Sequence, residues 1–286
     1  MTPTSPSPLR VAAVQMLPIF ADVPANLDAI VDRLEHAVDL GARLVVFPEC
    51  AATGYGFDSV AEAMPHAETI PGPGTEKIAQ TCKRLGGVHA IYGLLERDGD
   101  RLFNACVLVG PDGVVGSYRK VHLPYLGVDR WATPGDRPFA VHEVEGVRVG
   151  MHICYDGGFP EPARVMSLLG ADLLVLPTNW PRHAESAAEH MPPCRAMENV
   201  VYFLAVNRIG EERGFTFIGR SSIAGPNGEF LAMADAVSAE VLLADVDPAI
   251  ARRKRLIRVP GLHEVDRIAD RRPGFYGPIV EPNGRA

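Results

Sequence analysis

Three segments of the sequence place a reactive side chain directly after a run of residues typical of β-strands. The side chains are a carboxylate, an ammonium and a thiol, at Glu49, Lys120 and Cys154. Side chains at the ends of sheet strands converge on the crevices where α/β proteins bind ligands. Together the three groups are sufficient for nucleophilic acyl chemistry. The thiolate attacks, the carboxylate takes the thiol proton, and the ammonium opposes the negative charge of the tetrahedral intermediate.

Taken singly, each of these residues has a plainer interpretation. A glutamate or lysine at a strand end is more often a solvated side chain, and a lone cysteine is more often a small core residue. Cys154 differs from the other cysteines because Gly157 and Gly158 follow it. Glycines permit a sharp turn that exposes the side chain and aims backbone N–H groups at the same point. The cysteines without that setting are Cys50, Cys82, Cys106 and Cys194.

The elements that must position these side chains are short strands joined by tight turns, with helices between some of them. Helices are predicted over 27–38, 75–85 and 193–199, and in the stretch that ends at 169. Strands are predicted at 9–16, 43–47, 88–95, 102–109, 114–118, 139–144, 147–153, 173–176, 201–207, 215–224, 229–232 and 241–246. This mixture favours an α/β (α+β) protein in which two sheets pack on each other with helices outside.

Composition narrows the class of protein. The chain has 28 basic and 35 acidic residues, a net charge of −7, which argues against a nucleic-acid partner. No apolar run approaches the ~20 residues that span a bilayer. Five widely spaced cysteines favour free thiols and a cytoplasmic location. We expect a disordered lead-in at 1–8, a single domain over 9–286, and a solvated helix face at the basic run 252–255.

Two other kinds of site are weaker interpretations. A papain-like pair of Cys154 with His152 or His122 is disfavoured. His152 shares a strand face with Cys154, where neighbouring side chains do not easily meet, and the papain flanking signature is absent. A zinc site among the nine histidines lacks the usual ligand spacings.

Several stretches together resemble the signature blocks of the nitrilase (carbon–nitrogen hydrolase) superfamily. The three main blocks are 47–49, 118–124 and 152–156 followed by 159–161, and further similar stretches lie at 170–180, 195–199 and 217–228. The blocks come in the family's order and cover about residues 9 to 250.

The resemblance implies a four-layer α-β-β-α sandwich and a Glu-Lys-Cys triad at Glu49, Lys120 and Cys154. In that mechanism Glu49 deprotonates Cys154, and Lys120 with the backbone N–H of Tyr155 holds the oxyanion. A thioester forms and water hydrolyses it, with no metal or organic cofactor. The family also implies a homodimer or higher even homo-oligomer, with a C-terminal tail at 259–286 in the interface.

Two departures from the family pattern bear on the substrate. Many relatives carry a second glutamate after the lysine, and here Asp129 is the nearest carboxylate, which we expect to fill that role. Carbamoylase relatives carry arginines after the cysteine, where this chain has Gly157 and Gly158. Tyr155 and Asp156 after the nucleophile resemble the amidase-type branch, since nitrilases usually have a Trp-Glu pair there.

The predicted activity is therefore hydrolysis of a small amide to a carboxylic acid and ammonia. The alternatives are an N-carbamoyl (ureido) amidohydrolase or nitrilase of the same superfamily, and an inactive scaffold of the same fold. The residues expected to bind substrate are Tyr55, Trp131, Tyr155, Asn179 and Trp180. Packing is an equally weighted alternative for the two tryptophans.

Overall fold

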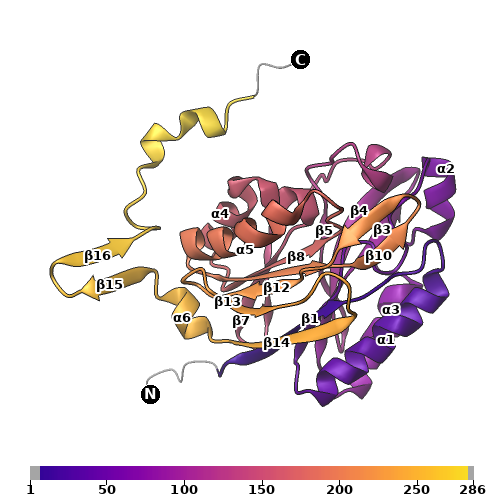
Figure 1. Ribbon diagram of the computed structural model, residues 1–286, viewed down its shortest axis with the longest axis horizontal. Coiled ribbons are helices and arrows are strands. Elements are labelled where there is room, and N and C mark those ends of the chain that lie inside the picture. Colours follow the sequence, from indigo (N-terminus) through magenta and orange to yellow (C-terminus); the bar gives the residue numbers. More distant parts are fainter. Residues whose placement is uncertain (1–6, 283–286) are drawn as a thin grey trace.

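The computed structural model describes residues 7–282, which form two six-stranded sheets packed face to face with helices on both outer sides (Figure 1). This arrangement confirms the predicted α-β-β-α sandwich. The lead-in expected at 1–8 lies almost entirely outside the described residues, and the first strand begins at Leu9.

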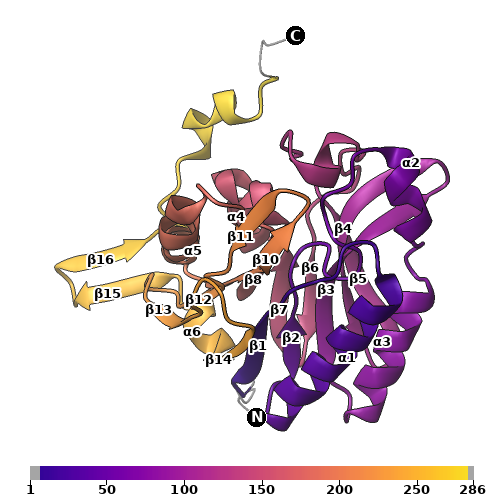
Figure 2. The same cartoon turned by 45° about the vertical axis from the view of Figure 1, so that its right-hand side comes forward.

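The first sheet has the strand order β14-β1-β2-β3-β4-β5. Its strands are β1 (Leu9–Gln15), β2 (Leu44–Val46), β3 (His89–Asp98), β4 (Arg101–Gly110), β5 (Gly113–Arg119) and β14 (Glu240–Val246). The helices α1 (Val23–Asp39) and α3 (Pro73–Arg84) cover its outer face (Figure 2). Helix α1 buries Leu27, Ile30 and Leu34, which recur at the spacing of one helix face. The Asp22 side chain caps its N-terminus by accepting from the N–H of Ala25.

The second sheet has the order β13-β12-β9-β8-β7-β6. Its strands are β6 (Val141–Val144), β7 (Val147–Met151), β8 (Leu173–Thr178), β9 (Tyr202–Asn207), β12 (Ser222–Ala224) and β13 (Phe230–Met233). The helices α4 (Pro160–Leu168) and α5 (Glu185–Asn199) cover it, and the short helices α2 (Val60–Ala63) and α6 (Pro248–Arg252) lie at the margins (Figure 1).

The inner strands are apolar along most of their length because both of their faces are buried. In β1, Val11 and Ala13 belong to the apolar cluster that includes the second sheet, whereas Ala12 and Val14 belong to the cluster under α1 and α3. Alternate residues of a strand point to opposite faces, so a strand covered on both faces is buried along its whole length.

The predicted strand 215–224 is wrong as a single element. It is divided into β11 (Phe215–Ile218), which pairs with β10 (Ile209–Glu212), and β12, which joins the second sheet. The break lies at Gly219 and Arg220, which both have φ +57°. Left-handed backbone turns the chain out of one sheet and into the other.

Two further predictions need correction. Helix α5 begins at Glu185, well before the predicted 193, although prolines at 192 and 193 lie inside it. The basic run 252–255 is not one solvated helix face, because α6 ends at Arg252 and the Lys254 ammonium donates to the carbonyl oxygens of Asn199 and Val200. The hairpin β15 (Arg255–Val259) and β16 (His263–Asp266) follows and overlaps the start of the predicted tail at 259–286.

Candidate active site

The three residues predicted to react lie at strand ends of two different sheets. Glu49 follows β2 and Lys120 follows β5 in the first sheet, while Cys154 follows β7 in the second. All three are buried, and Cys154 keeps 7% of its surface exposed. The packing of the two sheets therefore brings together groups that are 71 and 34 residues apart in sequence.

The Lys120 ammonium lies between two carboxylates. Its Nζ is 2.7 Å from Glu49 Oε1 and 2.5 Å from Asp129 Oδ2. The Asn104 side-chain amide donates to both carboxylates as well, at 2.7 Å to Glu49 and 2.8 Å to Asp129. Asn104 lies in β4 and was missed by sequence reasoning. Its only signal is an asparagine within an otherwise apolar strand.

Burial and mutual charge set the protonation of this group. Burial raises the pKa of the Glu49 carboxyl, the Lys120 ammonium opposes that effect, and the Asp129 carboxylate adds to it, so the pKa lies above its usual value. Burial alone would lower the pKa of Lys120, but the carboxylates of Asp129 and Glu49 outweigh it and hold that pKa well above its usual value. Lys120 is therefore a fixed positive charge, and Glu49 is a carboxylate of increased basicity.

The turn that carries Cys154 is held by Asp156. Cys154 has φ +46° and opens a 3₁₀ turn over Cys154–Gly158. Asp156 Oδ2 accepts from the N–H of Ile153 at 2.9 Å and from the hydroxyl of Tyr118 at 2.8 Å, and its Oδ1 accepts from the N–H of His122 at 3.0 Å. One carboxylate thus joins the nucleophile turn to the segment that carries the lysine.

The thiol of Cys154 needs a base before it can attack. Burial raises its pKa to about 12, and the Glu49 charge adds to that rise. The Lys120 ammonium, the Thr178 hydroxyl and the Asn179 backbone N–H act in the opposite direction. Glu49 Oε2 is buried and accepts no hydrogen bond from any residue that the structure describes, so the basic carboxylate has a free oxygen within this site. The arrangement can transfer a proton from a thiol to Glu49 as the thiol attacks.

Asp129 lies inside the site, where the fourth carboxylate was expected. Besides Lys120 and Asn104, it accepts from the Tyr55 hydroxyl at 2.7 Å. Gly127 makes this contact possible, because it has φ +48° and a Cβ there would lie 2.3 Å from the Tyr55 ring. Tyr55 is fully buried, and its hydroxyl holds the Asp129 carboxylate in place.

The other residues predicted to bind substrate divide into buried and exposed. Asn179 is buried, and neither of its side-chain polar atoms is hydrogen-bonded to another residue in the range 7–282. Trp180 is buried, and its backbone N–H donates to the Asn207 side chain. Tyr155 and Trp131 are 46% and 38% exposed.

The competing kinds of site receive no support from the geometry. The His152 ring nitrogen Nδ1 lies 3.1 Å from the Val175 carbonyl oxygen, and burial lowers the pKa of His152 to about 4. Within residues 7–282, no cluster of three or more histidine, cysteine or acidic side chains could hold a metal ion. In the same range, no helix has the length and apolar character needed to cross a membrane.

Comparison with known proteins identifies a family match over most of the chain. The model of the carbon-nitrogen hydrolase family matches residues 10–255. A nitrilase of Pyrococcus abyssi is 39% identical over 268 residues, which are 94% of this chain and 99% of that protein. The omega-amidase of Homo sapiens is 32% identical over 254 residues, which are 83% and 88% of the two chains.

Solved structures agree with this match. An amidase from Nesterenkonia sp. has a TM-score of 0.79 and 25% identity, with 96% of this chain and 97% of that chain covered. A variant of that amidase, with a TM-score of 0.74, 25% identity and coverage of 89% and 96%, carries the acetamide moiety of fluoroacetamide on its active-site cysteine.

Proposed function

The chain belongs to the carbon–nitrogen hydrolase family, and from that premise we propose that it hydrolyses a small amide to a carboxylic acid and ammonia through a thioester on Cys154. The observation that carries the proposal is the Lys120 ammonium held between Glu49 and Asp129, with Glu49 Oε2 left unpartnered. This supplies a base and a positive charge beside a buried thiol.

In the first half-reaction, the sulfur of Cys154 bonds to the amide carbon while its proton passes to Glu49. The carbonyl electron pair moves to oxygen, and Lys120 with the Tyr155 N–H stabilises the resulting oxyanion. Collapse of the intermediate breaks the C–N bond, and the nitrogen leaves as ammonia with the proton from Glu49. Water then attacks the thioester, Glu49 takes a water proton, and the sulfur leaves and is reprotonated.

The substrate is an amide with a neutral, partly apolar acyl group. Tyr155 and Trp131 expose part of their rings, and neither Gly157 nor Gly158 can bind a carboxylate through a side chain. These features support an amidase over an N-carbamoyl amidohydrolase. A nitrilase is the second candidate, because the Pyrococcus abyssi relative carries that name.

Matched pairs of amide and nitrile with the same acyl group test the proposal, with ammonia release as the measurement. We expect a higher kcat/KM for the amide of each pair. Acid quenching during turnover is expected to leave the acyl mass on the peptide that contains Cys154. Cys154→Ala should abolish ammonia release, and Cys194→Ala, which changes an exposed thiol on α5, should not. Faster turnover of the nitriles, or full activity of Cys154→Ala, would contradict the proposal.

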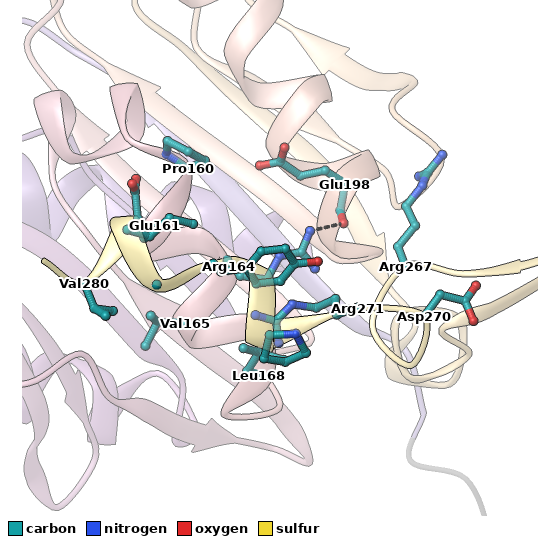
Figure 3. Close-up of a pocket in the computed structure, with 14 residues that line it drawn as sticks. Pro160, Glu161, Arg164, Val165, Leu168, Glu198, Arg267, Asp270, Arg271 and Val280 are labelled. Atoms are coloured by element: carbon teal, nitrogen blue, oxygen red, sulfur yellow. Dashed lines mark hydrogen bonds between the residues drawn. The ribbon is translucent and has the colours of Figure 1, made fainter.

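We also propose that the enzyme is a homodimer or higher even oligomer. The hairpin β15–β16 and the described residues after it extend away from the sandwich (Figures 1 and 2). Between those residues and α4 lies a groove of about 780 Å³, lined by Val165 and Leu168 of α4 and by Tyr276 and Val280 (Figure 3). Val165, Leu168, Ile279 and Val280 are all exposed at this groove, and clustered exposed apolar side chains mark interaction sites. The cytoplasmic location stays a prediction from the five free cysteines.

A further inference from the structure

Arg208 and Glu212 form a buried ion pair at the start of the hairpin β10–β11, which sequence reasoning did not predict. Arg208 and Glu212 have side-chain exposures of 0% and 3%, and Arg208 Nη1 donates to Glu212 Oε2 at 2.7 Å. The guanidinium also donates to the Pro18 carbonyl oxygen and lies 4.3 Å from the centre of the Phe217 ring. A buried ion pair adds little net stability, because lost hydration offsets the attraction. Stability alone therefore does not account for it.

The other oxygen of Glu212 holds the loop that follows Glu49. Glu212 Oε1 accepts from the backbone N–H groups of Tyr55 and Gly56, both at 2.7 Å. Hydrogen bonds to an ionised acceptor are stronger than those between neutral groups. The carboxylate of Glu212 thus fixes the backbone of a residue that lies 157 positions earlier in the chain.

Tyr55 connects Glu212 to the catalytic group. Its ring packs edge-on against Phe217 and Phe215 of β11, with centroids 6.5 Å away in both cases. Its carbonyl oxygen accepts from the N–H of Val128 at 2.8 Å, and its hydroxyl donates to Asp129. Asp129 in turn contacts the Lys120 ammonium. The contacts run without a gap from Arg208 to Lys120.

We propose that Glu212, paired with Arg208, is a positioning residue that sets Lys120 through Tyr55 and Asp129. Glu212 contacts no reacting atom, and it acts by placing the Tyr55 hydroxyl. The inference deepens the proposed function, since it concerns the same site and rests on Lys120 acting there.

The test is a double-mutant cycle between Glu212→Gln and Tyr55→Phe. The glutamine directs an N–H₂ group at Arg208 or at the loop amides, and the phenylalanine removes only the hydroxyl that contacts Asp129. The readout is the rate at which iodoacetamide, itself a small amide, alkylates Cys154, followed on the peptide by mass spectrometry. A displaced Lys120 no longer lowers the pKa of that thiol.

Each single variant should alkylate about tenfold more slowly, because small displacements of catalytic groups have large effects on rate. The double variant should be no slower than the slower single variant. Effects that multiply, or an unchanged rate in Glu212→Gln, would overturn the proposal. A purely structural loss would also multiply, so the cycle separates the two explanations.

Two controls complete the design. Asp172→Asn removes a buried carboxylate that is paired with the partly exposed Arg252 and Arg148. Asp172 directly precedes β8, at the end of that strand away from Thr178, and its loss should leave the alkylation rate unchanged. Glu212→Asp keeps the charge but shortens the arm, and the cycle is repeated with it if the glutamine variant does not fold. Because alkylation needs no turnover, a coupled cycle in a protein that hydrolyses no amide would refute the amidase proposal and retain this one.

Discussion

The single ammonium of Lys120 contacts two carboxylates, and the net charge of this group affects the protonation of the side chains around it. With Glu49 and Asp129 both ionised, the group carries one excess negative charge beside the Cys154 thiol. That charge disfavours a free thiolate and favours transfer of the thiol proton to Glu49 only as the sulfur bonds to carbon. In the mechanism proposed above, this charge favours concerted general-base attack over a thiolate formed in advance.

The pH dependence of activity follows from Glu49. The base must be ionised, so activity is lost as the pH falls through its pKa, which is raised by burial and further by Asp129. Asp129→Asn removes one of the charges that raise it. We therefore expect the acid limb of kcat/KM to move to lower pH, with a lower kcat because Lys120 loses one ionic partner. An unchanged acid limb together with an unchanged kcat would show that Asp129 does not fill the fourth role.

At the scale of the element, the strand β3 allows the segment that carries Glu49 to pack closely against it, because Gly93 has no side chain. A Cβ at that position would lie 2.3 Å from the backbone nitrogen of Cys50 and 2.7 Å from Glu49 Cα. The segment that carries the base therefore packs directly on the backbone of the neighbouring strand.

Gly93→Ala should displace Glu49 and lower kcat. Overpacking of this kind also costs about 1–3 kcal/mol of folding free energy. Ammonia release and the urea dependence of unfolding measure the two effects. Gly99→Ala, in the turn between β3 and β4, is the control. No described atom lies within 4 Å of its added Cβ, so kcat should stay unchanged although the φ of +61° makes the alanine destabilising. Wild-type kcat in Gly93→Ala would show that this close packing does not position the base.

Sequence patterns predict most of the strands and the positions of Glu49, Lys120 and Cys154 after strand ends, but they do not predict which residues contact them. The strands before Glu49, Lys120 and Cys154 are apolar runs with clear ends, so each reactive residue could be located. Asn104 and Glu212 act through contacts 55 and 157 residues away, which no local pattern encodes. The division of 215–224 into two strands depends on left-handed backbone at Arg220 as well as at a glycine, and the residue type at 220 gave no sign of it.

At the scale of the whole molecule, the C-terminal segment carries large apolar side chains that a single copy of the chain does not bury. Leu262, Phe275 and Val280 are 87%, 74% and 84% exposed. Truncation before Arg271 should reduce the mass measured by light scattering and also lower amide turnover, because the segment borders α4, which follows the nucleophile turn. Leu262→Ser in the full-length chain tests whether the β15–β16 hairpin takes part in the assembly, again by the mass from light scattering. A monodisperse full-length monomer would contradict the assembly.

The strand β14 joins the two halves of the chain within one sheet. It comes from the C-terminal half of the chain, yet it pairs with β1 along its whole length, from Leu9↔Val246 to Gln15↔Glu240. A backbone break between Asp129 and β6 would leave Glu49 and Lys120 on one fragment and Cys154 on the other. The second fragment would also carry the strand that completes the sheet of the first. The fold thus has the layout of a split reporter, in which enzymatic turnover signals that two separately made pieces have met.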